Sequence, residues 1–162
     1  MEMSDREILD HFVRTREKTI DLVKRVPNDW LSRRADGEDA TLGWLFMHIA
    51  DGPDWWMEHC MRDGQGWQYP GNGPFDRASI QNGLSASFDR VLAFFEYKGG
   101  EHMGREFELV PEKTEGKGKW LGRNRVLYLT DHEVHHRGKI VLSLRQWGMS
   151  DFPLCLSKLR CE

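Results

Sequence analysis

Cysteine is scarce in this 162-residue sequence, and its three copies are placed unevenly. Cys60, Cys155 and Cys161 cannot all pair within the chain, and two of them lie close to its C-terminus. Small secreted domains that depend on disulfides carry an even number of cysteines at regular spacings. The sequence therefore disfavours that class and predicts a protein of a reducing compartment, the cytoplasm.

Long apolar runs and clustered positive charge are also missing. A membrane-spanning helix needs roughly 18 apolar residues in a row, and no stretch approaches that length, while the acidic segment MEMSDREILD lacks the apolar centre of a signal peptide. The 23 lysines and arginines are scattered and the net charge is −3, so no basic patch for a nucleic-acid backbone is expected. We therefore expect no membrane and no nucleic-acid partner.

Tryptophan, in contrast, is abundant, with seven copies. Charged residues make up 30% and hydrophobic residues 39% of the chain, which is the balance of a globular protein rather than of a disordered one. The length suits one domain over residues 1–162, and one small core does not accommodate seven indoles. Some of the tryptophans are therefore expected to line a pocket or an interface.

Amphipathic helical spacing recurs in four segments, the first of which begins with a capping box of Ser4 and Glu7. One short alternating stretch, REFELV at 105–110, indicates a hairpin or a lid. Four helices without a convincing sheet predict an all-α four-helix bundle with long connections. The predicted helices run from about Asp5 to Val26, from Thr41 past Pro53, from a cap at Ser79 to about Gly100, and from about Arg123 to Gly148.

The second of these helices has an aromatic face that includes His48. At 100° per residue, Trp44 and Trp55 lie about 40° and 20° from His48, so both are candidate walls of a pocket. Simple core packing is the alternative for each tryptophan. Pro53 lies within the same helix and is expected to kink or restart it one turn past His48, because proline removes a backbone donor.

The fourth helix contains DHEVHHRGKI, residues 131–140, with three histidines within five positions. On a helical wheel His132 and His136 lie on the apolar arc, whereas His135 lies on the polar side. Histidines at i and i+4 suit two ligands of one metal ion, and helix bundles build such sites from facing helices. His48 is then the predicted third ligand. Ordinary surface or core histidines are the alternative.

Glu133 and Arg137 also fall within the apolar arc of the fourth helix, and their i, i+4 spacing permits a salt bridge. Buried charges need partners, so a structural role is the first interpretation for both residues. In the functional alternative, Glu133 accepts a proton or supports a ligand histidine, and Arg137 holds an anionic group of the substrate. Both residues are therefore catalytic candidates.

Two segments resemble a known family. GWLFMHIADGPDWWMEH resembles the second-helix motif, and DHEVHHRGKIVLSLRQWG the fourth-helix motif, of the DinB-like, damage-inducible four-helix-bundle metalloproteins, which include thiol-dependent S-transferases. The resemblance implies a DinB-like fold over all four helices. It also implies metal binding by His48, His132 and His136, the same three residues that the helical wheel selects.

Three neutral imidazoles leave coordination positions open, as in catalytic zinc sites, and nickel or another divalent first-row ion is also accommodated. Together with the resemblance, this predicts a metal-dependent transferase that uses a small-thiol cosubstrate and acts on a small molecule. A metal-dependent hydrolase or isomerase with the same ligands is one alternative. A non-enzymatic, stress-related binding or structural bundle is another. A homodimer is compatible with each of them.

Overall fold

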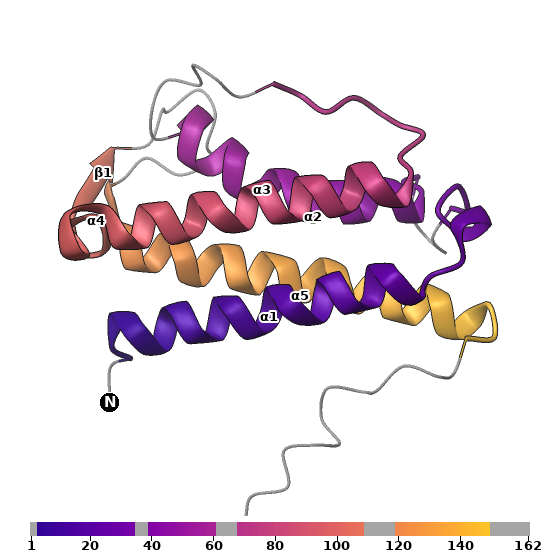
Figure 1. Cartoon of the computed structure of the whole chain (residues 1–162), viewed down its shortest axis with the longest axis horizontal. Helices are drawn as coiled ribbons and strands as arrows, with labels where there is room; N and C mark the ends of the chain where they lie inside the picture. The colour runs from indigo at the N-terminus through magenta and orange to yellow at the C-terminus, as the bar shows by residue number, and fades with distance from the viewer. Residues whose placement is uncertain (1–2, 35–38, 61–67, 109–118, 150–162) are drawn as a thin grey trace, which may run out of the picture.

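The structure, a computed structural model, describes residues 3–34, 39–60, 68–108 and 119–149, and its four long helices run side by side (Figure 1). Helix α1 packs against α3 and α5, and α2 packs against the same two helices, so each long helix has two neighbours. The prediction of an all-α four-helix bundle is confirmed. In the described ranges, no helix combines the length and the apolar character needed to cross a membrane. The four helices are α1 (Asp5–Arg25), α2 (Leu42–Asp54), α3 (Arg77–Glu96) and α5 (Gly122–Gln146).

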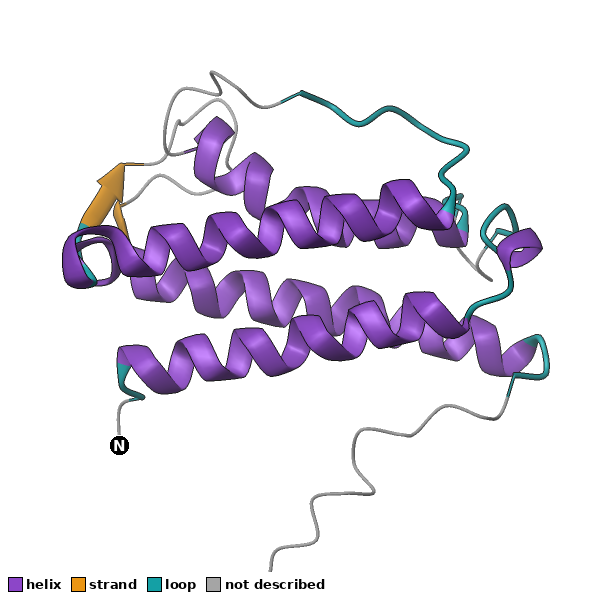
Figure 2. Ribbon diagram, viewed as in Figure 1, coloured by secondary structure: helices purple, strands orange, loops and turns teal. Residues whose placement is uncertain are grey.

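Shorter elements lie in the connections, and the sequence pattern predicts only one of them. Of the two alternatives for REFELV, the structure shows a hairpin, in which β1 (Glu106–Glu108) pairs antiparallel with β2 (Lys119–Leu121) (Figure 2). Residues 109–118 lie outside the described ranges. The other short elements are η1 (Asn28–Trp30), η2 (Trp55–Cys60), η3 (Tyr97–Gly99) and α4 (Glu101–Gly104).

Local hydrogen bonds explain where the long helices begin. The capping box at the start of α1 is confirmed, since the Ser4 amide donates to Glu7 Oε2 at 2.8 Å. The predicted cap of α3 is wrong: Asp76, not Ser79, is the N-cap, and its carboxylate accepts a hydrogen bond from the Ser79 amide at 2.7 Å. The Asp76 carboxylate thus accepts a hydrogen bond from one of the amides that have no partner within the first turn of the helix, which is the task of an N-cap side chain. The helix therefore starts at Arg77.

The expected interruption at Pro53 takes the form of a change in helix type. Helix α2 continues through Pro53 to Asp54, and the chain then winds as the π-helix η2. The Trp55 amide donates to the carbonyls of both Asp51 and Gly52, so the hydrogen-bond register is shared where the two helix types meet. Proline has no backbone N–H and so removes one of the hydrogen bonds of the α-helix, and a local π-helical turn accommodates the lost hydrogen bond. The tryptophans after Pro53 therefore do not follow the α-helical wheel.

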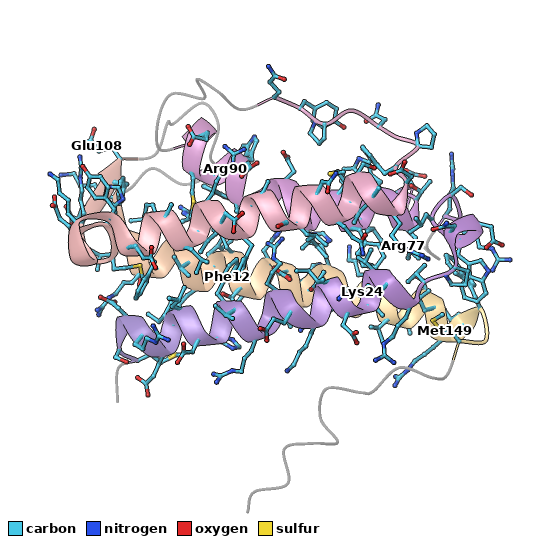
Figure 3. The ribbon with its side chains drawn as sticks, in the orientation of Figure 1. Phe12, Lys24, Arg77, Arg90, Glu108 and Met149 are labelled. Atoms are coloured by element: carbon cyan, nitrogen blue, oxygen red, sulfur yellow. The ribbon has the colours of Figure 1, made fainter. Side chains whose placement is uncertain are left out.

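The interior has two apolar clusters with a polar layer between them. One cluster contains Phe12 and Leu129, and the other contains Val23 and Leu144; Phe12 is labelled between the helices in Figure 3. The intervening positions of α1, α3 and α5 are buried yet polar. The residues of this polar layer are Thr15, Arg16, Thr19, Ser87, Thr130 and Glu133.

Candidate metal centre

His48 of α2 meets His132 and His136 of α5, and all three side chains are half-buried. One ring nitrogen from each of the three lies within 4.8 Å of the other two. His48 Nε2 and His132 Nε2 are 3.1 Å apart, and the ring centroids lie 4.5 to 4.8 Å from one another. The i, i+4 pair presents two rings on one side of α5, and α2, which packs on α5, supplies the third.

The donor set fits a divalent metal ion. Zinc–nitrogen bonds of about 2.0–2.1 Å put two nitrogens of a tetrahedral site roughly 3.3 Å apart. The 3.1 Å separation of His48 and His132 is close to that value, and the nitrogens of all three rings lie within 4.8 Å of one another, so side-chain rotation can bring the third nitrogen closer. The buried Nδ1 of His136 has no hydrogen-bond partner among the residues that the structure describes. Three imidazoles could therefore bind one ion and leave further positions open.

Electrostatics keep the three imidazoles in the neutral form that a metal requires. Burial lowers the pKa of His48. Burial, followed by the positive charge that His48 would carry, lowers the pKa of His132 to about 4. Burial, followed by repulsion from His132 and His48, lowers the pKa of His136 to about 3. At neutral pH the rings are thus unprotonated and able to donate a lone pair.

These lowered pKa values predict that the metal-free protein becomes less stable in acid. Histidine in the unfolded chain protonates near pH 6.5, whereas folded His132 and His136 protonate only near pH 4 and 3. Between these values the unfolded state binds more protons, so the free energy of unfolding falls as the pH drops from about 6.5 toward 4. Above about pH 6.5 the contribution of the neutral histidines to stability is fully present. Urea midpoints of the metal-free protein at pH 7, 6 and 5 measure this slope. An unchanged midpoint between pH 7 and 5 would contradict the prediction.

Two aromatic side chains hold the histidine rings from outside the triad. The Trp44 indole stacks on His48, with ring centroids 4.8 Å apart and planes at 10°. Tyr128 lies against His132 at 6.2 Å and 23°. Trp44 also lines a cavity of about 650 Å³. The other described lining residues of this cavity are Arg34, Asp39, Ala40, Thr41, Tyr69 and Asn72.

Trp55 and His135, the other residues considered near this centre, are not among the converging groups. Trp55, the first residue of η2, makes an edge-to-face contact with Trp56 at 4.8 Å, and its role as a pocket wall stays a prediction. His135 is exposed, as the polar side of the wheel requires, although its ring lies 5.0 Å from that of His136. His135 is therefore a surface neighbour of His136 and not one of the three converging histidines.

Gly52 contributes to the centre, and sequence reasoning missed it. A β-carbon at this position would lie 3.3 Å from Cε1 and 3.4 Å from Nδ1 of His132, closer than side chains normally approach. The absence of a side chain lets α2 pass close to the His132 ring. The available signal was the Gly-Pro pair one turn after His48, although on its own that pair indicates only a break in the helix.

Glu133 and Arg137 each bind across the bundle to α1. Glu133 Oε2 lies 3.0 Å from Arg16 Nη2, and both side chains are 1% exposed. Arg137 Nη1 donates to the Thr15 carbonyl at 2.7 Å and to Thr19 Oγ1 at 3.2 Å. The expectation that these charges have structural partners is confirmed, but the salt bridge that their spacing permits is not formed. The partner of Glu133 comes from another helix.

Arg16 is the second residue that sequence reasoning missed. Besides the Glu133 carboxylate, its guanidinium binds the Leu84 carbonyl at 3.3 Å and Ser87 Oγ at 3.0 Å on α3. Burial lowers the pKa of Arg16 and the Glu133 carboxylate opposes that shift; arginine stays charged under these conditions. A signal was present, because Arg16 lies four residues after Phe12 within the buried stripe of α1.

Comparison with known proteins supports this architecture. The structure is similar to that of a DinB-like protein from Bacillus subtilis, with a TM-score of 0.68 and 20% identity over 91% of this chain and 96% of that one. It is equally similar to a DinB-like protein from Bacillus cereus, with a TM-score of 0.68 and 17% identity over 92% and 96%. Comparison with curated proteins finds no match. A model of the DinB family matches residues 1–157, so the chain belongs to that family.

Proposed function

We propose that this protein is a divalent-metal-dependent enzyme that transfers a small thiol to an electrophilic small molecule. The observation that carries the proposal is the convergence of three imidazoles, with one nitrogen of each within 4.8 Å of the others. When bound, a zinc or nickel ion supplies the Lewis acidity that lowers the pKa of a thiol in an open coordination position. Such a site requires neutral histidines, and the lowered pKa values of all three favour that form.

The residues of this chain have separate tasks in the proposal. His48, His132 and His136 bind the ion, and the ring stacked on His48 limits the rotation of that ligand. Glu133 and Arg137 act as positioning residues, since their bonds to Arg16 and to the Thr15 carbonyl fix the rotation of α5. This assignment follows from the burial of Glu133, whose side chain is 1% exposed and faces a guanidinium.

The thiol is supplied by a cosubstrate. No cysteine lies next to the three histidines in the sequence, and Cys155 and Cys161 lie outside the described ranges. The cavity of about 650 Å³ that shares Trp44 with the centre has the size of a small-molecule site. We propose this cavity as the route by which the small molecules reach the ion.

Assays of the metal-reconstituted protein test the proposal. A panel of electrophiles and activated esters is incubated with and without small thiols, and thiol consumption and product are followed. Turnover that requires both metal and thiol is expected, with loss to background in His136→Ala and retention in His135→Ala. Metal-dependent turnover without thiol would instead assign a hydrolase or isomerase. Binding of metal without any turnover would leave a non-enzymatic bundle.

The proposal includes a cellular and an oligomeric expectation. The odd number of cysteines favours a reducing compartment, and we propose the cytoplasm. A homodimer is the assembly we propose for the DinB fold of this chain, because two-fold dimers are the commonest symmetric oligomers of soluble proteins. Light scattering coupled to size-exclusion chromatography distinguishes a 19.0 kDa monomer from a dimer.

A further inference from the structure

A second cavity, of about 500 Å³, is formed by η2, the end of α3, η3, α4 and β1. Its described lining contains none of the three histidines of the metal centre. Arg90, which Figure 3 labels, belongs to this lining and pairs with Asp54 near the start of η2. The volume lies within the range of small-ligand pockets, roughly 300–1,000 Å³. The cavity is therefore a separate candidate site.

Aromatic rings form one wall of this cavity. The rings of Tyr97 and His102 are stacked, with centroids 3.8 Å apart and planes at 12°. Phe94 lies 4.9 Å from His102, and Phe107 of β1 meets it edge-on at 5.5 Å. His102 is buried, whereas Tyr97 is 40% exposed. A wall of packed rings with one open member favours a planar, aromatic ligand.

The turn that brings these rings together is strained. Lys98, between Tyr97 and His102, has φ +46° although it is not glycine, and Gly99 and Gly100 follow with φ +72° and +99°. A non-glycine residue in this region costs free energy and persists only where the surroundings determine it. The stacked pair is thus held by a specific backbone conformation.

Two arginines and two carboxylates lie at or beside the cavity. Arg90 Nε binds Asp54 Oδ1 at 2.8 Å, so that guanidinium is compensated on one side. The Arg105 guanidinium lies 5.2 Å from the centre of the Phe107 ring, and within the described ranges it forms no ion pair with a carboxylate. Glu58 is the one carboxylate among the described lining residues. Because Arg90 already pairs with Asp54, Arg105 is the arginine of the described lining that we expect to meet an anion, which suits a ligand with a single negative charge better than a polyphosphate.

We propose that this cavity binds a small aromatic carboxylate, with its ring against the Tyr97, His102 and Phe107 wall and its carboxylate at Arg105. A guanidinium presents two parallel donors that match the two oxygens of a carboxylate. The packed rings accept the planar part of the same molecule. Both requirements are met by monocyclic and bicyclic aromatic acids and not by aliphatic acids or neutral arenes.

Calorimetric titration of the full-length, metal-loaded protein with benzoate and 2-naphthoate tests the proposal. The neutral amides benzamide and 2-naphthamide have nearly the same shape and are expected to bind at least tenfold more weakly. Arg105→Gln, a change at an exposed side chain, is expected to weaken 2-naphthoate binding at least tenfold. Arg33→Gln is the matched control, because Arg33 also lies over aromatic rings, those of Trp30 and Trp147, but outside this cavity.

The outcome is independent of the metal centre. Aromatic-acid binding is expected to survive in His136→Ala, so failure of the proposed enzymatic activity leaves this inference intact. Amides that bind as tightly as the acids, unchanged affinity in Arg105→Gln, equal loss in Arg33→Gln, or no saturable binding would each overturn it.

Discussion

His48→Ala and His136→Ala are expected to lose stoichiometric binding of a divalent metal ion. The wild-type protein, after reconstitution with zinc or nickel, should carry one ion per chain. Replacing partners that merely support a ligand costs about 10- to 100-fold in metal affinity, so removal of one of three ligands is expected to cost at least about 100-fold. Elemental analysis of untagged protein after dialysis, followed by calorimetric titration, measures the loss.

His135→Ala is the matched control for these two variants. Its exposed imidazole lies only 5.0 Å from His136 but is outside the group of converging nitrogens. It should therefore keep one ion per chain. Circular dichroism of each variant establishes that the helices remain. Wild-type protein without stoichiometric metal, or undiminished binding in both His48→Ala and His136→Ala, would eliminate the proposed centre.

The meeting of the three histidines was predictable because helical periodicity determines which side chains share a face. His132 and His136 are one turn apart on the apolar arc of α5, and His48 lies on the inward face of α2. The structure brings these rings together, while metal binding itself stays a prediction. Gly52 could not be found by the same reasoning, since its role depends on how closely two helices cross, and periodicity contains no such distance.

The long helices of the fold were predictable from the sequence, but one helix cap and one change of helix type were not. The bounds of α1 and α5 and the capping box at Ser4 follow from local signals that act within a few residues. The cap of α3 was misassigned because Asp76 and Ser79 are both good cap residues, and the structure places Asp76 at the N-cap, where its carboxylate accepts from the Ser79 amide. The π-helix after Pro53 was not expected. It arises from a change in the backbone hydrogen-bond register after α2, and single-residue helix propensities do not encode such a change.

The buried ion pair links the interior of the bundle to the metal centre. Glu133 directly follows His132 in α5, and its carboxylate meets Arg16 of α1 at 3.0 Å. Arg16 also binds the Ser87 hydroxyl of α3, so one guanidinium connects three of the four long helices. Apolar side chains can slide past one another, but these bonds are directional. The polar layer therefore specifies the rotation of α5 that points His132 and His136 at His48.

Glu133→Gln is accordingly expected to destabilise the protein by about 3–5 kcal/mol, because it leaves the Arg16 guanidinium buried without a counter-charge. For a chain of this length that corresponds to a fall of roughly 6–20 °C in melting temperature. Urea unfolding of the metal-free protein measures the free energy. Asp10→Asn is the matched control: the Arg6–Asp10 pair is exposed, at 75% and 41%, and its loss should cost less than about 1 kcal/mol.

A double variant separates the uncompensated charge from the lost packing. Arg16→Met combined with Glu133→Leu removes both charges and keeps similar volumes, so it is expected to recover most of the stability that Glu133→Gln loses. Its affinity for zinc should nevertheless stay below that of the wild type, because the directional bonds between α1, α3 and α5 are gone. A Glu133→Gln variant within about 1 kcal/mol of the wild type would show that Arg16 is satisfied without the carboxylate. Wild-type zinc affinity in the double variant would show that apolar packing alone positions the two histidines of α5.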